Sequence, residues 1–284
     1  MLALWLMSSA FLSAAPPRAA VLEPVANMHA QPADDAEVVS QAIYGTPLEL
    51  LEQRGAWAKV QTPDGYTGWM NSRAFRAVPT GAEQYASDGR VAEVESLFAN
   101  LYGEPDVTKH APLATVPFET RLEVISEADQ NERRWIQVRL VDGRAAWLQQ
   151  GDAAFDPPKL PVSALPEFAR RFLGLPYLWG GTSTFGYDCS GFVQMLYRRA
   201  GVLLPRDAQP QAGWEGLARV ERNDLRPGDL VYFGASERKI THTGLYLGDG
   251  QFISATVHER PVVRIDRLAD PFWTKLYAGG RRLK

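Results

Sequence analysis

Apolar and polar positions alternate in two stretches of the chain, residues 25–75 and 97–155, in short segments separated by Gly, Pro and Asp. Each stretch contains an Asn five residues before a Pro, a Pro-led alternating segment, a segment that begins with Trp, a Gly turn and a final Trp. Period-two alternation over such short segments predicts β-strands. We therefore expect two small SH3-like β-barrels, over residues 22–78 and 90–156.

The pattern changes after the proline-rich linker at residues 156–162. Ser163 can cap a helix that ends near Phe172, and Asp188 can cap a second helix, over residues 189–200, whose apolar positions follow helical spacing. Gly201 supplies a stop for this second helix.

Strand signals follow these two helices. They predict a strand over residues 230–233 and a hairpin that turns at residues 248–250. Helices followed by an antiparallel sheet indicate an α+β domain, which we place at residues 161–284.

Composition narrows the function classes. With 284 residues, 45% of them apolar, the chain can form several cores, and its net charge of -3 argues against a nucleic-acid partner. The first fifteen residues are apolar or small and end in Ser13-Ala14-Ala15, which predicts a secretory signal within residues 1–20. This segment is too short to cross a bilayer stably. We expect an exported protein, periplasmic or extracellular, that is monomeric and not inserted in a membrane after processing.

Cys189 is the one cysteine of the chain, so an internal disulfide is excluded. It follows the predicted cap Asp188 and therefore lies in the first helical turn, where the helix dipole favours an anion and lowers a thiol pKa. Cys189 is accordingly a candidate nucleophile. The alternative is a buried, inert cysteine.

A nucleophilic thiol needs a base and a group that orients the base. His242 is the candidate base because it opens a hairpin strand beside the small residues Thr243 and Gly244. A three-residue hairpin loop would place Ser254 and His258 on the same face as His242, whereas a two-residue loop would turn Ser254 to the other face. The orienting group is therefore Ser254, with His258 as the second candidate.

Four ordered motifs support one family resemblance: GLPYLWGGTSTFGYDCSGF, LPRD, RPGDLVYF and HTGLYLGDGQFI. They closely resemble the NlpC-type papain-like cell-wall peptidases. Together with the SH3-like segments, the layout resembles γ-D-glutamyl-L-diamino acid endopeptidases related to dipeptidyl peptidase VI. The resemblance implies cleavage of the γ-D-glutamyl to diamino acid bond in peptidoglycan stem peptides with a free N-terminal L-Ala.

The resemblance also implies roles for individual residues. Cys189 would be the nucleophile and His242 the base, while Ser254 stands where the family usually has His or another orienting polar residue. The positions that line the substrate cleft in this subgroup correspond to Tyr177, Trp179, Asp188, Ser190, Arg206 and Asp207. An acidic residue and an aromatic residue of the first SH3-like domain, matched by Glu37 and Trp69, would close the far end of the cleft.

Two other functions stay open. The chain could be a cell-wall-binding protein with a weakened or inactive catalytic domain, which Ser254 favours, or a Cys-His amidase or acyltransferase with another substrate. We expect no cofactor and no metal, because the sequence has no HExxH motif and no Cys/His cluster at ligand spacing.

Overall fold

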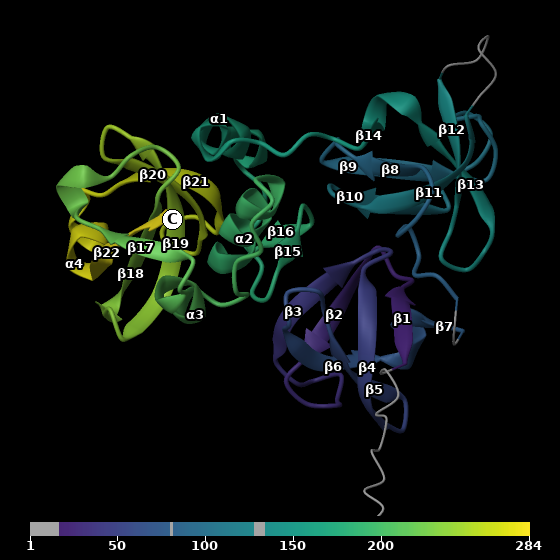
Figure 1. The fold of residues 1–284 in the computed structure, drawn as a ribbon, viewed down its shortest axis with the longest axis horizontal. Coiled ribbons are helices and arrows are strands. Elements are labelled where there is room, and N and C mark those ends of the chain that lie inside the picture. The colour runs from purple at the N-terminus through teal and green to yellow at the C-terminus, as the bar shows by residue number, and fades with distance from the viewer. Residues whose placement is uncertain (1–16, 80–81, 128–133) are drawn as a thin grey trace, which may run out of the picture.

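The computed structural model describes residues 17–79, 82–127 and 134–284. They form three modules: a first module of residues 18–78, a second of residues 91–155 and a third of residues 162–284 (Figure 1). The predicted signal falls mostly outside the described residues. In the described part of the chain, no helix has the length and apolar character needed to cross a membrane.

The first module is a seven-stranded antiparallel sheet in the order β3-β2-β6-β5-β4-β1-β7. Its elements are β1 (Arg18–Val21), β2 (Val25–His29), β3 (Val38–Ile43), β4 (Pro47–Arg54), β5 (Trp57–Gln61), β6 (Thr67–Asn71), the 3-10 helix η1 (Ser72–Ala74) and β7 (Phe75–Val78). The strand β1 pairs with β4 and β7. Residues 18–20 of the predicted signal therefore belong to this sheet.

The second module repeats this arrangement strand for strand, in the order β10-β9-β13-β12-β11-β8-β14. Its elements are β8 (Val91–Val94), β9 (Phe98–Tyr102), β10 (Ala114–Pro117), β11 (Arg121–Glu127), β12 (Trp135–Arg139), β13 (Ala145–Gln149), η2 (Gln150–Asp152) and β14 (Ala153–Phe155). Even the bulge between the fourth and fifth strands recurs. The matching strand orders account for the repeat in the sequence, while closure of either sheet into a barrel stays a prediction.

The third module has its helices first and most of its sheet afterwards, as the sequence predicts. Its first half contains η3 (Val162–Ala164), α1 (Leu165–Ala169), η4 (Arg170–Phe172), β15 (Thr182–Ser183), β16 (Gly186–Tyr187), α2 (Cys189–Arg199) and α3 (Ala208–Gly213). Its second half contains β17 (Leu217–Val220), η5 (Arg222–Asp224), β18 (Leu230–Ser236), β19 (Lys239–Gly248), β20 (Gln251–Thr256), β21 (Val262–Arg267), α4 (Pro271–Leu276) and β22 (Tyr277–Leu283).

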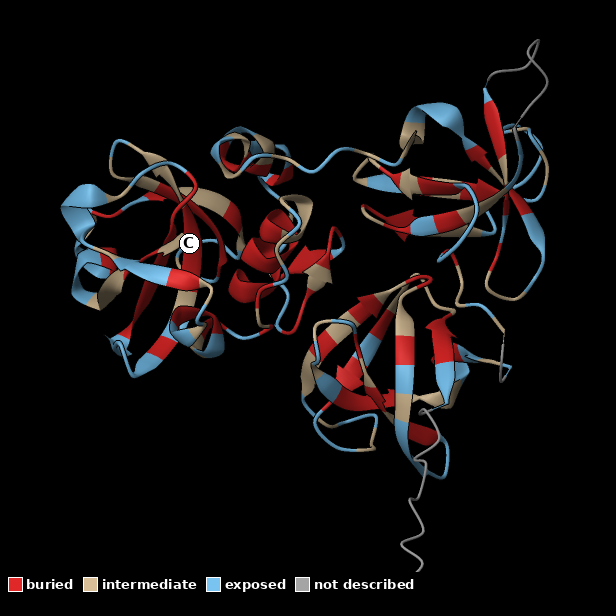
Figure 2. Cartoon of the chain, viewed as in Figure 1, coloured by how far each residue is buried: buried red, intermediate tan, exposed pale blue. Residues whose placement is uncertain are grey.

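Helix α2 is the centre of the third module. It packs on β19 and β20 of the six-stranded sheet β17-β22-β18-β19-β20-β21, and its other side faces the first and second modules. Residues 189–197 are consequently buried on all sides, although the apolar spacing alone predicts a helix with one exposed face (Figure 2). The fold thus places α2 between the other two modules, and the second module bonds its last two residues, Arg198 and Arg199.

Candidate active site

Cys189 begins helix α2, and Asp188 is its N-cap. The Asp188 side chain accepts a hydrogen bond from the backbone N–H of Gly191 at 2.7 Å, as the sequence predicts. The Cys189 sulfur lies beside the backbone N–H of Thr243 on β19, next to His242 in sequence, and the residue is 8% exposed. The start of α2 therefore brings the Cys189 sulfur to the strand that carries His242, beside the residue that follows it.

The His242 ring is half-buried and hydrogen-bonds through Nε2 to Oγ of Ser254 at 3.0 Å. This bond occupies one ring nitrogen and leaves Nδ1 for another partner. His258, the second candidate for orienting the base, instead stacks on Phe272 with ring centroids 3.8 Å apart. The predicted contact of His242 with Ser254 is present.

The β19–β20 hairpin places His242 and Ser254 on one face by combining a two-residue loop with a bulge. Its loop has only two residues, Asp249 and Gly250, both with positive φ, which fits a two-residue β-turn. Such a loop alone would turn Ser254 away from His242. A bulge at Leu247 absorbs one residue, so Leu245 pairs with Ile253 as it would around a three-residue loop.

Gly244 lets the His242 ring reach Ser254. It lies on the same face as both residues, and a Cβ there would come within 2.7 Å of the Phe252 ring and 3.2 Å of Ser254 Cβ. Since no side chain fills this position, the imidazole can lean diagonally across the strand pair to the hydroxyl.

The electrostatics differ from the expectation for a helix N-terminus. Burial, and secondly the negative charge of Asp188, raise the pKa of Cys189 to about 12. Burial, and secondly the charge of His258, lower the pKa of His242 to about 3. The predicted lowering of the thiol pKa is therefore wrong, because burial and the charge of Asp188 outweigh the backbone N–H groups of Thr243 and Ser190 and the charge of Arg206. Both shifts favour the uncharged forms, a thiol and a neutral imidazole.

Arg206 holds the groups around the thiol in place. Its guanidinium donates to both carboxylate oxygens of Asp188 (3.0 and 2.6 Å), to Ser190 Oγ (3.0 Å) and to Ser40 Oγ of the first module (2.9 Å). Arg206 is 3% exposed. Its donors are therefore directed at protein acceptors, and its predicted place in the lining of the substrate cleft stays a prediction.

The first module reaches this region through β3 and the segment that precedes it. The indole Nε1 of Trp179, a residue 62% exposed, donates to Oε1 of Glu37 at 3.0 Å. Gly180, with φ 73°, lies so close to β3 that a Cβ would be 2.9 Å from the carbonyl oxygen of Val38. Glu37 thus contacts Trp179, one of the predicted cleft residues, while its role in closing the cleft stays a prediction. Tyr177 also lies near the thiol: burial first, and then the charge of Cys189, raise its pKa.

Trp69 does not take part in this arrangement. It is 6% exposed inside the first module, where the Arg54 guanidinium lies 4.8 Å from its ring. Instead Tyr66, three residues earlier in the GYTGW segment, faces the third module: burial, and then the charge of Asp207, raise its pKa to about 12. Strand alternation made Trp69 a core residue, whereas Tyr66 lies in the turn before β6 and is only partly buried against the first module's core. That difference in position was the available signal.

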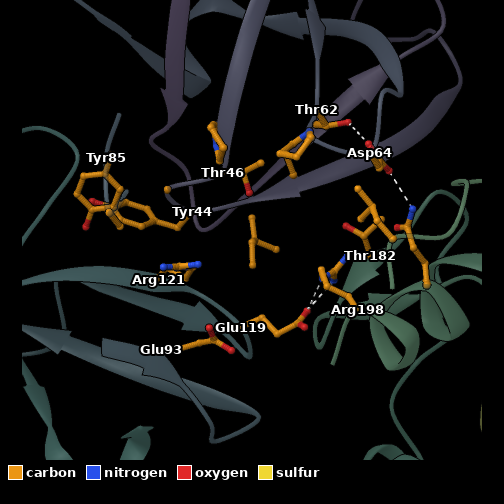
Figure 3. Close-up of a pocket in the computed structure, with 18 of the residues that line it drawn as sticks. Tyr44, Thr46, Thr62, Asp64, Tyr85, Glu93, Glu119, Arg121, Thr182 and Arg198 are labelled. Carbon is orange, nitrogen blue, oxygen red and sulfur yellow. Dashed lines mark hydrogen bonds and ion pairs between the residues drawn. The ribbon is translucent and has the colours of Figure 1, made fainter. Parts of the chain in front are cut away.

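A cavity of about 610 Å³ lies where the three modules meet (Figure 3). Hydrogen bonds at its edge join Gln194 Nε2 to Asp64 Oδ2 at 2.9 Å and Arg198 to Glu119 at 2.6 Å. The described residues that line it do not include Cys189 or His242, so it is separate from the candidate active site. Among the described residues, no group of three His, Cys, Asp or Glu side chains could hold a metal ion.

Three family matches cover most of the chain. The NlpC/P60 family matches residues 174–282, the bacterial dipeptidyl-peptidase Sh3 domain matches residues 28–75, and the GW (Gly-Tryp) dipeptide domain matches residues 83–152. They fall on the third, first and second modules, respectively.

Individual relatives match along most of their length. A gamma-D-glutamyl-L-lysine dipeptidyl-peptidase of Bacillus cereus is 35% identical over 86% of this chain and 74% of that protein. The Bacillus subtilis protein of the same name is 30% identical over 77% of this chain and 72% of that protein. The crystal structure of a NlpC/P60 family protein from Bacillus cereus superposes with a TM-score of 0.80, at 28% identity, and covers 94% of this chain and 99% of that one. The chain belongs to the NlpC/P60 family.

Proposed function

We propose that this protein is a cysteine peptidase that hydrolyses the γ-D-glutamyl to diamino acid bond of peptidoglycan stem peptides with a free N-terminal L-Ala. The observation that carries the proposal is the placement of Cys189 at the start of α2, beside the strand on which His242 is bonded to Ser254. The two relatives named for γ-D-glutamyl-L-lysine peptides support the choice of bond.

The first chemical step is attack by the thiol. Nδ1 of His242 takes the Cys189 proton as the sulfur bonds to the γ-glutamyl carbonyl carbon, and the carbonyl π electrons move to oxygen. The backbone N–H of Cys189, at the helix start, and the nearby Tyr177 hydroxyl are the donors available to this oxyanion. A neutral thiol and neutral imidazole suit this step, because the proton moves only as the bond forms.

Two further steps release the products. The oxyanion collapses, the C–N bond breaks, and the His242 imidazolium gives its proton to the departing amine of the diamino acid. His242 then takes a proton from water as the water attacks the thioester. The C–S bond breaks and the imidazolium returns its proton to the sulfur, which restores the starting state.

Glu37 supplies the selectivity for a free amino end. Its carboxylate accepts a hydrogen bond from the indole N–H of the exposed Trp179, whereas both carboxylate oxygens of Asp188 are paired with Arg206. A substrate ammonium is attracted to the Glu37 carboxylate, and a blocked, uncharged end is not. The first module thereby limits the length of peptide that fits. Action on peptidoglycan peptides places the protein in the periplasm or outside the cell.

The test is to incubate the protein with L-Ala-γ-D-Glu-diaminopimelate, with its lysine counterpart, and with both peptides acetylated at the amino end. We expect release of L-Ala-D-Glu from the free peptides, slower cleavage of the acetylated ones, and no cleavage by Cys189→Ala. No release between pH 5 and 9 would favour a wall-binding protein instead. Equal cleavage of free and acetylated peptides would contradict the closed cleft and favour an amidase or acyltransferase.

A further inference from the structure

The His242 ring is supported on its face as well as at its edge. Trp273, in the short helix α4, stacks on it with ring centroids 4.9 Å apart and an interplanar angle of 27°. Phe233 of β18 adds a tilted contact at 5.7 Å. Ser254 thus holds one ring nitrogen, while Trp273 covers one face of the ring.

Trp273 is itself held firmly. It is 2% exposed and packs against the rings of Phe233 (4.8 Å) and Phe252 (5.2 Å). The Asp266 carboxylate lies beside its indole N–H. Trp273 Nε1 and Asp266 Oδ2 are both buried, and neither atom makes a hydrogen bond among the described residues, although the two groups lie beside each other.

The loop after β20 completes the support. His258 meets the Trp273 ring edge-on at 5.5 Å and stacks on Phe272. Arg264 ties this loop to the same carboxylate, because it donates to the His258 carbonyl at 3.3 Å and pairs with Asp266 at 2.9 Å. His258, the second candidate for orienting His242, therefore packs against the indole ring of Trp273.

A hydroxyl alone is a weak support for an imidazole. A single hydrogen bond fixes one atom of the ring but lets the ring plane tilt about that bond. A flat indole packed on the ring face removes this freedom, since tilting would open a gap or create a clash. Ser254 and Trp273 together fix both the edge and the plane.

We propose that Trp273 is a positioning residue that, with Ser254, holds the His242 ring in the orientation needed to accept the Cys189 proton. This inference rests on the proposed function, because it assigns Trp273 to the same catalytic pair. Loss of orientation lowers the fraction of encounters in which the proton can move. It therefore lowers kcat and leaves KM nearly unchanged.

The experiment compares Trp273→Ala, Trp273→Phe and Trp135→Ala. Trp135 is a buried indole of the second module that meets Tyr102 edge-on, so it controls for loss of aromatic packing alone. We expect Trp273→Ala to lower kcat by roughly 10-fold to 100-fold with KM unchanged. Trp273→Phe, which keeps a flat ring, should retain most of the wild-type activity. Trp135→Ala should keep the wild-type kcat, and thermal unfolding checks that each variant is folded at the assay temperature.

A second readout is the pH profile of Cys189 alkylation by iodoacetamide, which requires no peptide substrate. Burial lowers the pKa of His242, so the wild-type ring stays neutral and able to accept a proton well below its ordinary pKa. Trp273→Ala admits water to the ring and raises the pKa of His242. The alkylation rate falls at low pH, where His242 becomes protonated, and we call this fall the acid limb of the profile. In Trp273→Ala the acid limb should move to higher pH. The titratable group whose charge reaches His242 is His258, from the loop after β20. The Cys189 thiol lies beside the backbone N–H of Thr243, the residue that follows His242 on β19. A His258→Gln variant shows whether His258 contributes to the shift.

The outcomes separate this inference from the proposed function. If the wild type cleaves no peptide but Trp273→Ala still moves the acid limb, the function is wrong and the positioning role stands. If Trp273→Ala keeps both the wild-type kcat and the wild-type acid limb, the positioning role is wrong and the function stands. Equal losses in Trp273→Ala and Trp135→Ala, with no shift of the acid limb, would reduce Trp273 to a stabilising residue and overturn the inference.

Discussion

The first and second modules share one strand order but attach to the third module in opposite ways. The first module contacts it through polar side chains near the thiol, among them Glu37 on Trp179 and Ser40 on Arg206. The second module inserts Phe118 into the hydrophobic core of the third, where it meets Phe168 and Phe172. One repeat therefore shapes the active site, and the other is part of the structural core.

Charged pairs strengthen the attachment of the second module. Arg199 of α2 donates to Glu93 at 2.6 Å and to Glu95 at 2.7 Å, and Arg198 is bonded to Glu119. Glu119 has φ 67°, an unfavourable backbone conformation for a residue with a side chain, and it directly follows the inserted Phe118. Such a junction is difficult to separate, so we expect the second and third modules to unfold together.

The largest effect should come from breaking the buried junction. Phe118→Ala removes a 2% exposed ring from the core of the third module and should lower the free energy of unfolding by about 3–5 kcal/mol. Phe98→Ala is the matched control, because Phe98 of the same module contacts Phe185 but is 38% exposed. Chemical denaturation measures both. Similar losses in the two variants would contradict the insertion.

The next largest effect should come from the first module and should appear in specificity. Glu37→Ala should lower the preference for free over acetylated peptides by about 10-fold, equivalent to about 1.4 kcal/mol, because the substrate ammonium loses a carboxylate. The free energy of unfolding should hardly change. Steady-state kinetics on both peptides measures the ratio, with the exposed Glu49→Ala as control. If Glu37→Ala lowered the free energy of unfolding but left the preference for free peptides unchanged, the first module would have a structural role and not a role in specificity.

A smaller effect should follow from Tyr66→Phe, which removes the hydroxyl that faces Asp207. Loss of one neutral hydrogen-bonding group is worth about 1 kcal/mol, so we expect KM for the free peptide to rise several-fold. Trp69→Phe, a change inside the first module, should leave KM unchanged. The opposite ranking would restore Trp69 as the residue that closes the cleft.

The smallest effect should be a pH dependence at the second module. Burial, which outweighs the charge of Arg199, raises the pKa of Glu93 in the folded protein. A raised pKa means that the folded state binds the proton more tightly, so this contribution to stability is present at low pH and is lost as pH rises through the folded pKa.

Glu93→Gln should abolish this contribution while keeping an acceptor for Arg199. Thermal unfolding at pH 4.5 and pH 7 should therefore differ less in the variant than in the wild type, by about 1 kcal/mol or less. Glu95→Gln, which alters the other acceptor of Arg199, is the control. An unchanged pH dependence in Glu93→Gln would mean that Glu93 is ionised to the same extent in the folded and unfolded chain.

Local sequence signals predicted the parts of the site that depend on neighbouring residues. Asp188 caps α2 as expected, and His242 and Ser254 meet across one hairpin. The bulge at Leu247 was not predictable, because the pattern allowed both a two-residue and a three-residue loop. The raised pKa of Cys189 also escaped prediction, since it depends on burial by segments distant in the sequence.

Contacts between modules were the least predictable. The motif that contains Trp69 drew attention to that residue, although Tyr66 beside it faces the third module. Phe118 is one apolar position among several in the second stretch. Its burial in another module becomes visible only when both surfaces are known, because alternation says which side a residue faces and not what covers it.

The close packing at Gly244 has a consequence for how this hairpin can vary. A Cβ at position 244 would lie 2.7 Å from the Phe252 ring and 3.2 Å from Ser254 Cβ, so any other residue there would displace one of these two side chains. The partner of the base therefore keeps its place only while its cross-strand neighbour is a glycine.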